Sequence, residues 1–94
     1  MAGSDRSVNG QPSLLLGHAH RGFRGHIQGI HVGEGMSDLP PGELEKRLIE
    51  LGFVEGASIE ILHEGPFSAD PIAVRVNNAT IALRRREAMA ILVA

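Results

Sequence analysis

Apolar residues recur with helical spacing in one segment of this chain, residues 43 to 51. Leu44, Leu48 and Leu51 lie at positions i, i+4 and i+7, and Ile49 widens the apolar stripe. Two glutamates fall in the first turn, where negative charge is favourable to the helix dipole. The pattern predicts one short α-helix with an apolar face that packs on the rest of the protein.

The residues on either side of this helix predict where it begins and ends. Two prolines precede it, and we expect them to prevent an earlier start. Gly52 suits the left-handed residue that ends many helices, so that Phe53 would fold back onto Leu48 in a Schellman motif. Gly56 suits the positive-φ position of a type II turn before a strand. We therefore expect Gly52 and Gly56 to be structural turn residues.

Apolar and polar residues alternate in three segments after the helix, which predicts β-strands. These segments are Ser58–His63, Ile72–Val76 and Thr80–Arg84. The Asn-Asn-Ala sequence between the last two suits a tight turn, because asparagine tolerates positive φ. The sequence RREAM then predicts a single helical turn, and Ile91–Val93 a closing strand.

The N-terminal half of the chain is rich in glycine and less regular. Residues 13 to 32 predict one or two strands, bent where Gly22, Gly25 and Gly29 permit bulges or close backbone approach. Residues 33 to 42 are a loop by composition. Together the elements predict a mainly β fold, a small SH3-like barrel of five or six short antiparallel strands with one short α-helix.

Length and composition narrow the class of protein. The 94 residues suit one domain, which we assign to residues 13 to 94, after a small, polar and poorly ordered extension at residues 1 to 12. The absence of cysteine excludes disulfides and thiolate metal sites. No apolar run is long enough to span a membrane, and the net charge of −2 gives no reason to expect nucleic acid binding. We expect a cytoplasmic protein without direct membrane insertion.

Five histidines are the candidates for metal binding: His18, His20, His26, His31 and His63. On a strand, His18 and His20 would present both rings on one face, which makes them the best pair. A site needs three or more ligands, and no carboxylate lies at helical or strand spacing beside this pair. We therefore predict no metal site and no cofactor, and at most weak Fe²⁺ or Zn²⁺ binding.

Catalytic groups are also scarce. The chain has no cysteine and no tyrosine, and no serine or histidine is placed beside an identifiable buried acid. The glycines do not form a phosphate-binding loop, because the G-x-x-x-x-G-K-[ST] pattern is absent. The sequence therefore predicts that the protein is not an enzyme.

Residues 47 to 93 carry a series of motifs in unbroken order. They are Leu51–Gly52, Gly56, the alternating strand Ile59–Leu62, Asp70–Pro71–Ile72, Ala82–Leu83–Arg84–Arg85 and Glu87–Ala88. In this series the chain resembles ferrous iron transport protein A, FeoA. The resemblance implies a small cytoplasmic SH3-like barrel, not an enzyme, that works with FeoB, a membrane ferrous iron transporter with a GTPase domain. Through FeoB the protein would lie at the periphery of the inner membrane.

The leucine stripe has two interpretations. A single helix on a small barrel has to cover an open end, so most of the stripe is expected to be core packing. The stripe is wider than one short helix needs, which would leave Leu48, Ile49 or Phe53 partly exposed to a partner. We take Leu48 and Phe53 as the apolar centre of a partner-binding surface.

The run Arg84, Arg85 and Arg86 also has two interpretations. It is either a solvated edge or a docking site for an acidic protein surface or anionic lipid headgroups. Given the resemblance, we expect these arginines to form a basic rim beside Leu48 and Phe53 and to bind FeoB.

Two other functions stay open on the sequence. The histidines would suit a metal-binding or metal-sensing module. An SH3-type peptide-binding domain is less favoured, since such grooves are lined with aromatic residues and this chain has three Phe and no Trp or Tyr. The sequence leaves open the oligomeric state and whether the protein activates, inhibits or assembles the transporter.

Overall fold

The computed structural model describes residues 13–94, so the predicted extension at residues 1–12 lies outside it. The elements follow in the order β1 Leu14–Leu15, η2 Leu16–His18 (a 3₁₀ turn), β2 Arg24–Ile30, α1 Pro41–Glu50, β3 Ser58–Glu64, β4 Ile72–Val76, β5 Ala79–Leu83, α2 Arg85–Ala88 and β6 Ile91–Val93. The strands pair antiparallel in the order β1-β6-β2-β3-β4-β5. The predicted small, mainly β barrel is confirmed.

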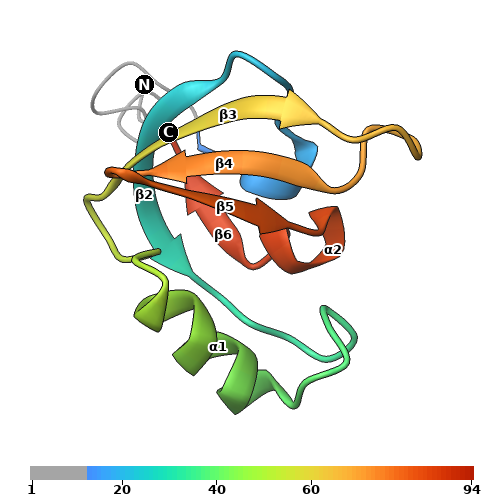
Figure 1. Ribbon diagram of the computed structural model, residues 1–94. Coiled ribbons are helices and arrows are strands. Elements are labelled where there is room, and N and C mark those ends of the chain that lie inside the picture. Colours follow the sequence, from blue (N-terminus) through green and yellow to red (C-terminus); the bar gives the residue numbers. More distant parts are fainter. Residues whose placement is uncertain (1–12) are drawn as a thin grey trace, which may run out of the picture.

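The bend of β2 folds the sheet over into a barrel (Figure 1). Residues 24–26 pair with β3, whereas residues 27–30 pair with β6, so one strand belongs to both halves of the sheet. The register with β6 shifts between Ile27 and Gly29, which marks a bulge. At Gly25 an added Cβ atom would collide with the carbonyl oxygen of Ala94. The predicted bending and close backbone approach are thus present.

The strand predictions agree closely with the structure. Ile72–Val76 and Ile91–Val93 have the predicted bounds. Strand β3 is one residue longer than predicted at its end, and β5 begins and ends one residue earlier than predicted. The predicted helical turn after β5 is α2. The N-terminal stretch contains the short strand β1 and the long strand β2, with the η2 turn after β1.

Helix α1 begins two residues earlier than predicted, because prolines do not prevent a helix start. Pro41 occupies the first helical position and Pro40 the N-cap. The first N–H groups of a helix have no partner within it, so the N–H that proline lacks is not missed there.

The end of α1 is the predicted Schellman motif. The N–H of Gly52 donates to the carbonyl oxygen of Ile49 at 3.0 Å, and that of Phe53 to Leu48 at 2.9 Å. Gly52 has φ +104°, which a residue with a Cβ adopts only under strain. Gly56, with φ +89°, is the third residue of a turn that starts at Val54. The N–H of Ala57 closes this turn by donating to the carbonyl oxygen of Val54 at 3.0 Å.

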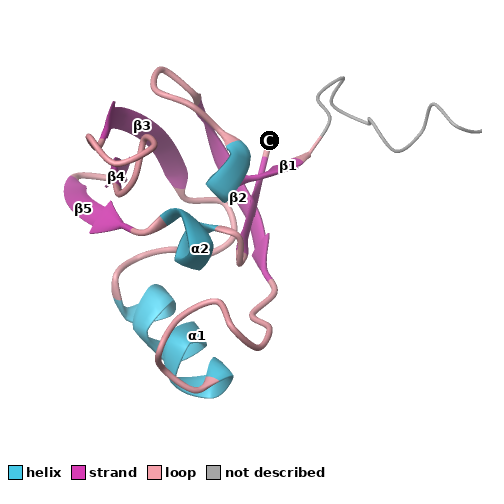
Figure 2. Ribbon diagram, turned by 90° about the vertical axis from the view of Figure 1, so that its right-hand side faces the viewer, coloured by secondary structure: helices cyan, strands magenta, loops and turns pink. Residues whose placement is uncertain are grey.

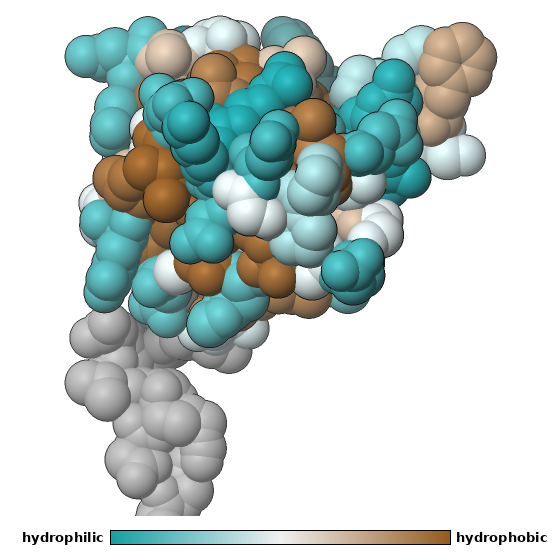
Figure 3. Space-filling model, turned by 90° about the horizontal axis from the view of Figure 1, so that it is seen from below, coloured by the Kyte–Doolittle hydropathy of each residue, from teal (hydrophilic) through white to brown (hydrophobic). Residues whose placement is uncertain are grey.

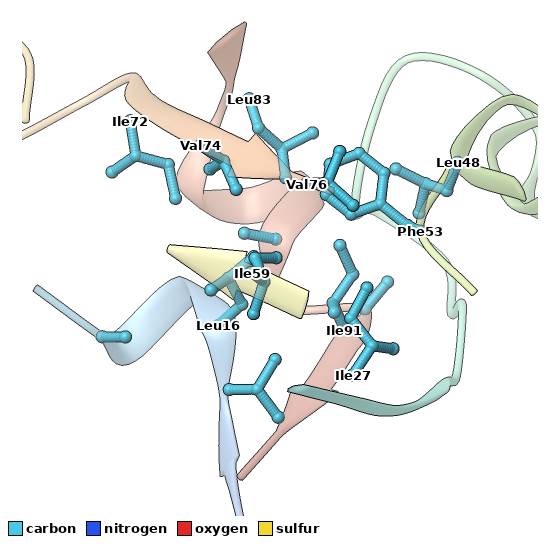
Figure 4. Packing of buried hydrophobic residues seen from close by; sticks show 14 of the residues in the cluster. Leu16, Ile27, Leu48, Phe53, Ile59, Ile72, Val74, Val76, Leu83 and Ile91 are labelled. Atoms are coloured by element: carbon cyan, nitrogen blue, oxygen red, sulfur yellow. The ribbon is translucent and has the colours of Figure 1, made fainter. Parts of the chain in front are cut away.

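Helix α1 covers one end of the barrel (Figures 1 and 2). Leu44 and Leu48 of the helix and Phe53 after it are buried. Figure 4 shows Phe53 between Leu48 and Val76 of β4, so the exit from the helix is packed onto the sheet. Burial of each such side chain stabilises the fold by about 1.5–3 kcal/mol.

Candidate functional site

The three arginines lie where β5 ends and α2 begins. Arg84 is the N-cap of α2, and Arg85 and Arg86 are in its first turn. Successive residues of a helix point about 100° apart. Arg84 and Arg86 are exposed, whereas Arg85 turns inward, so the three do not form the continuous rim that the sequence predicted.

Arg85 binds several segments of the chain at once. Its Nη1 donates to the carbonyl oxygens of Gly17 at 3.0 Å and Ala19 at 2.7 Å. Its Nε donates to the carbonyl oxygen of Ala69 at 2.8 Å, and its Nη2 to Glu64 Oε2 at 2.6 Å. The side chain is only 17% exposed. Arg85 therefore joins η2, the end of β3 and the β3–β4 loop, and its charge is used within the fold.

Glu64 shares one oxygen between two basic side chains. Its Oε2 lies 3.0 Å from Nδ1 of the exposed His20 and also accepts the bond from Arg85. The hydrogen bond to His20, helped by the charges of His20 and Arg85, lowers the pKa of Glu64 below its usual value. Glu64 is therefore held as a carboxylate that completes the binding site of Arg85.

Arg84 and Arg86 line a surface hollow together with Asp38 and Asp70. Arg86 Nη2 forms an ion pair with Asp38 Oδ1 at 2.8 Å, and both side chains are exposed. Asp70 Oδ1 accepts a hydrogen bond from the backbone N–H of Arg85 at 2.9 Å. The hollow thus contains both signs of charge, and residues 84 and 86 are its accessible bases.

The apolar centre expected at Leu48 and Phe53 is not on the surface, because both side chains are buried in the core. The neighbouring Ile49 and Val54 are exposed instead, by 47% and 42%. They line a shallow hollow between the end of β2 and α1, which has no lining residue in common with the arginine hollow. Figure 3 views the α1 end of the molecule, where brown apolar patches are interrupted by polar side chains.

Phe67 lies in the β3–β4 loop with its side chain 78% exposed, and it is not among the partner-binding residues predicted from the sequence, although its loop, EGPFSADP, is the alternative partner surface if the arginines do not bind FeoB. In this loop Ser68 and Ala69 have φ of +57° and +63°, a left-handed conformation that costs a residue with a Cβ about 1–3 kcal/mol. The signal in the sequence is a phenylalanine inside a loop rich in turn residues, with no alternating pattern around it.

The histidine pair is not arranged as predicted. His18 is in the η2 turn and His20 follows it, so the two are not on one strand. His20 is hydrogen-bonded to Glu64 instead. Within residues 13–94, no group of three or more His, Cys, Asp or Glu side chains could hold a metal ion.

Comparison with protein families gave a match to the FeoA domain over residues 14–94. No curated protein gave a significant match. In the part of the chain that the structure describes, no helix has the length and apolar character needed to cross a membrane.

Several experimental structures have the same fold. The chain is 25% identical to FeoA from Stenotrophomonas maltophilia in complex with zinc, described as an SH3 domain protein, with a TM-score of 0.69 over 86% of this chain and 89% of that one. It is 27% identical to a FeoA-like protein from Clostridium acetobutylicum, with a TM-score of 0.71 over 89% of this chain and 87% of that one.

A third structure is more similar in sequence but belongs to a longer chain. Iron(II) transport protein A from Clostridium thermocellum is 35% identical, with a TM-score of 0.70, and the match covers 85% of this chain and 44% of that one. The SH3-like barrel is therefore confirmed, and the family match extends over nearly all of the described residues. The chain belongs to the FeoA domain family.

Proposed function

We propose that this protein is an accessory factor of ferrous iron uptake that acts by binding the FeoB transporter. The observation that carries the proposal is the FeoA domain match over residues 14–94, with the same barrel in proteins described as iron transport factors. The ionisable cluster around Arg85 is used within the fold, whereas Arg84 and Arg86 are exposed and accessible to a partner.

The surface that we propose for FeoB contains Arg84 and Arg86. Both are exposed beside a hollow, and Arg86 is held by an exposed pair with Asp38 that a partner carboxylate can replace. Accessible charges at the rim of an interface mainly set orientation and association rate. Arg85, which the sequence also suggested as a contact, would support this surface from within the fold through its bond to Asp70. Leu48 and Phe53, the other suggested contacts, are core residues and would act on binding only through the stability of the fold.

The experiment is a binding measurement between the purified chain and its FeoB, solubilised in detergent, at low and high salt. Reversing both charges in Arg84→Glu/Arg86→Glu should weaken binding about tenfold at low salt, mostly through the association rate, and less at high salt. The matched control is Arg24→Glu/Arg75→Glu, which makes the same charge change at exposed positions on another hollow.

A melting curve for each variant separates lost contact from lost fold. If the wild-type chain does not bind FeoB, the proposed function is wrong. If it binds and both double variants bind equally well, FeoB contacts a surface other than the arginine hollow.

A further inference from the structure

Phe67 is the most exposed large apolar side chain among residues 13–94. It is 78% exposed, against 47% for Ile49 and 42% for Val54. Figure 1 shows that its loop, between β3 and β4, projects beyond the end of the sheet. A single exposed apolar residue is common on protein surfaces and does not by itself indicate a binding site. A binding role for Phe67 therefore depends on how rigidly its loop is held.

The base of this loop is closed by hydrogen bonds within the loop. The N–H of Gly65 donates to the carbonyl oxygen of Pro71 at 2.8 Å, and the N–H of Asp70 to that of Phe67 at 3.2 Å. The approach of the two ends is so close that a Cβ atom at residue 65 would collide with the backbone of Asp70.

The rest of the protein also fixes the loop, through Arg85. The Nε of Arg85 binds the carbonyl oxygen of Ala69, and its backbone N–H binds Asp70 Oδ1. Ser68 and Ala69 adopt left-handed conformations that persist only where the surroundings impose them. These contacts fix the loop backbone next to Phe67, whose side chain is exposed.

We propose that Phe67 is an apolar anchor that inserts into a pocket of a protein partner. The inference rests on the proposed function, and the partner is then FeoB. Aromatic side chains on a preorganised backbone are typical interface anchors, because little conformational entropy remains to be lost on binding. Asp70, at the base of the loop, also lines the hollow of Arg84 and Arg86, so the loop that carries the anchor borders the charged hollow.

A protein pocket fits this surface better than a lipid bilayer does. Asp70 lies in the loop, and anionic headgroups repel its carboxylate. Arg85 is paired with Glu64 and Arg86 with Asp38, so little net positive charge is left to attract a membrane. A single ring also gives only weak membrane affinity. A protein pocket that excludes water can instead remove the whole surface of the ring from solvent.

The test measures binding of purified variants to detergent-solubilised FeoB. Phe67→Ser should raise the Kd about tenfold or more, and Phe67→Leu, which keeps an apolar side chain, should stay within about threefold of the wild type. The matched control is Val54→Ser, which removes another exposed apolar side chain on a different face and should leave the Kd unchanged. Melting curves should be the same for all variants, since neither residue is in the core.

The outcomes separate the two proposals. If the wild type binds and Phe67→Ser binds equally well, the anchor is wrong and the proposed function stands. If the wild type does not bind, the proposed function fails and the anchor with it.

A second experiment measures binding of the same variants to vesicles of phosphatidylethanolamine and phosphatidylglycerol without FeoB. Vesicle binding that depends on Phe67 while FeoB binding does not would overturn the protein pocket in favour of the bilayer.

Discussion

Replacing Arg85 by methionine tests whether this residue holds the barrel and its long loop together. Methionine keeps an unbranched apolar side chain but has none of the hydrogen-bond donors of the guanidinium group. Three bonds to the carbonyl oxygens of Gly17, Ala19 and Ala69 are lost. A hydrogen bond from a charged donor contributes about 1.5–3 kcal/mol.

The expected destabilisation is smaller than the sum of these bonds. Arg85 is 17% exposed, so water can reach some of the carbonyl oxygens that lose their donor. We therefore expect Arg85→Met to lower the free energy of unfolding by about 2–4 kcal/mol. A domain of this size has about 5–15 kcal/mol in total. The corresponding loss in Tm is roughly 8 °C or more.

Urea titration followed by circular dichroism, with thermal melts, measures this effect. The matched control is Arg84→Met, in which the neighbouring but exposed arginine is changed, and it should stay within about 0.5 kcal/mol of the wild type. If Arg85→Met is as stable as Arg84→Met, the bonds of Arg85 do not stabilise the protein and the argument for a fixed loop fails with them.

Three further predictions concern the turns, the carboxylate and the histidines. Gly52→Ala and Gly56→Ala should each lower the free energy of unfolding by about 1 kcal/mol or more, because both positions have positive φ; denaturant melts in which both are neutral would contradict this. The lowered pKa of Glu64 means that its contribution to stability is fully present above its usual value of 4.5 and is lost as the pH falls through the lowered pKa. Stability measured against pH should therefore decline less steeply on the acid side in Glu64→Gln, and an unchanged slope would show that Glu64 titrates alike in the folded and unfolded states. The double change His18→Ala/His20→Ala should leave ferrous iron uptake close to wild type in a complementation assay, and a collapse of uptake with an intact fold would show that the histidines bind a functional ion.

The predictions that succeeded depended on short stretches of sequence. The Schellman end of α1 needs only Leu48, Gly52 and Phe53, which lie within six residues of one another. Strand β4 was recognised from its alternating pattern alone. The early start of α1 was missed because Pro41 was treated as a residue that excludes a helix, although it is tolerated at the first position.

The candidate site depends on contacts that local patterns do not contain. Arg85 binds carbonyl oxygens of residues 17 and 19, far away in the sequence, so the run of three arginines gave no sign that the middle one is internal. The helical turn beginning at Arg85 was predicted, but the inward direction of Arg85 depends on the packing of α2 against η2 and the β3–β4 loop, which the local pattern does not contain. Leu48 and Ile49 are adjacent in α1, and the packing of Leu48 beside Phe53 in the core leaves Ile49 as the exposed one of the two.

The most direct test of the central claim is the initial rate of radiolabelled ferrous iron uptake in cells that lack this protein but keep their FeoB. We predict that the rate changes while the amount of FeoB in the membrane does not. The wild-type chain should restore the rate, and the Arg84→Glu/Arg86→Glu variant should restore it only in part. An uptake rate that is the same with and without the protein would contradict the account.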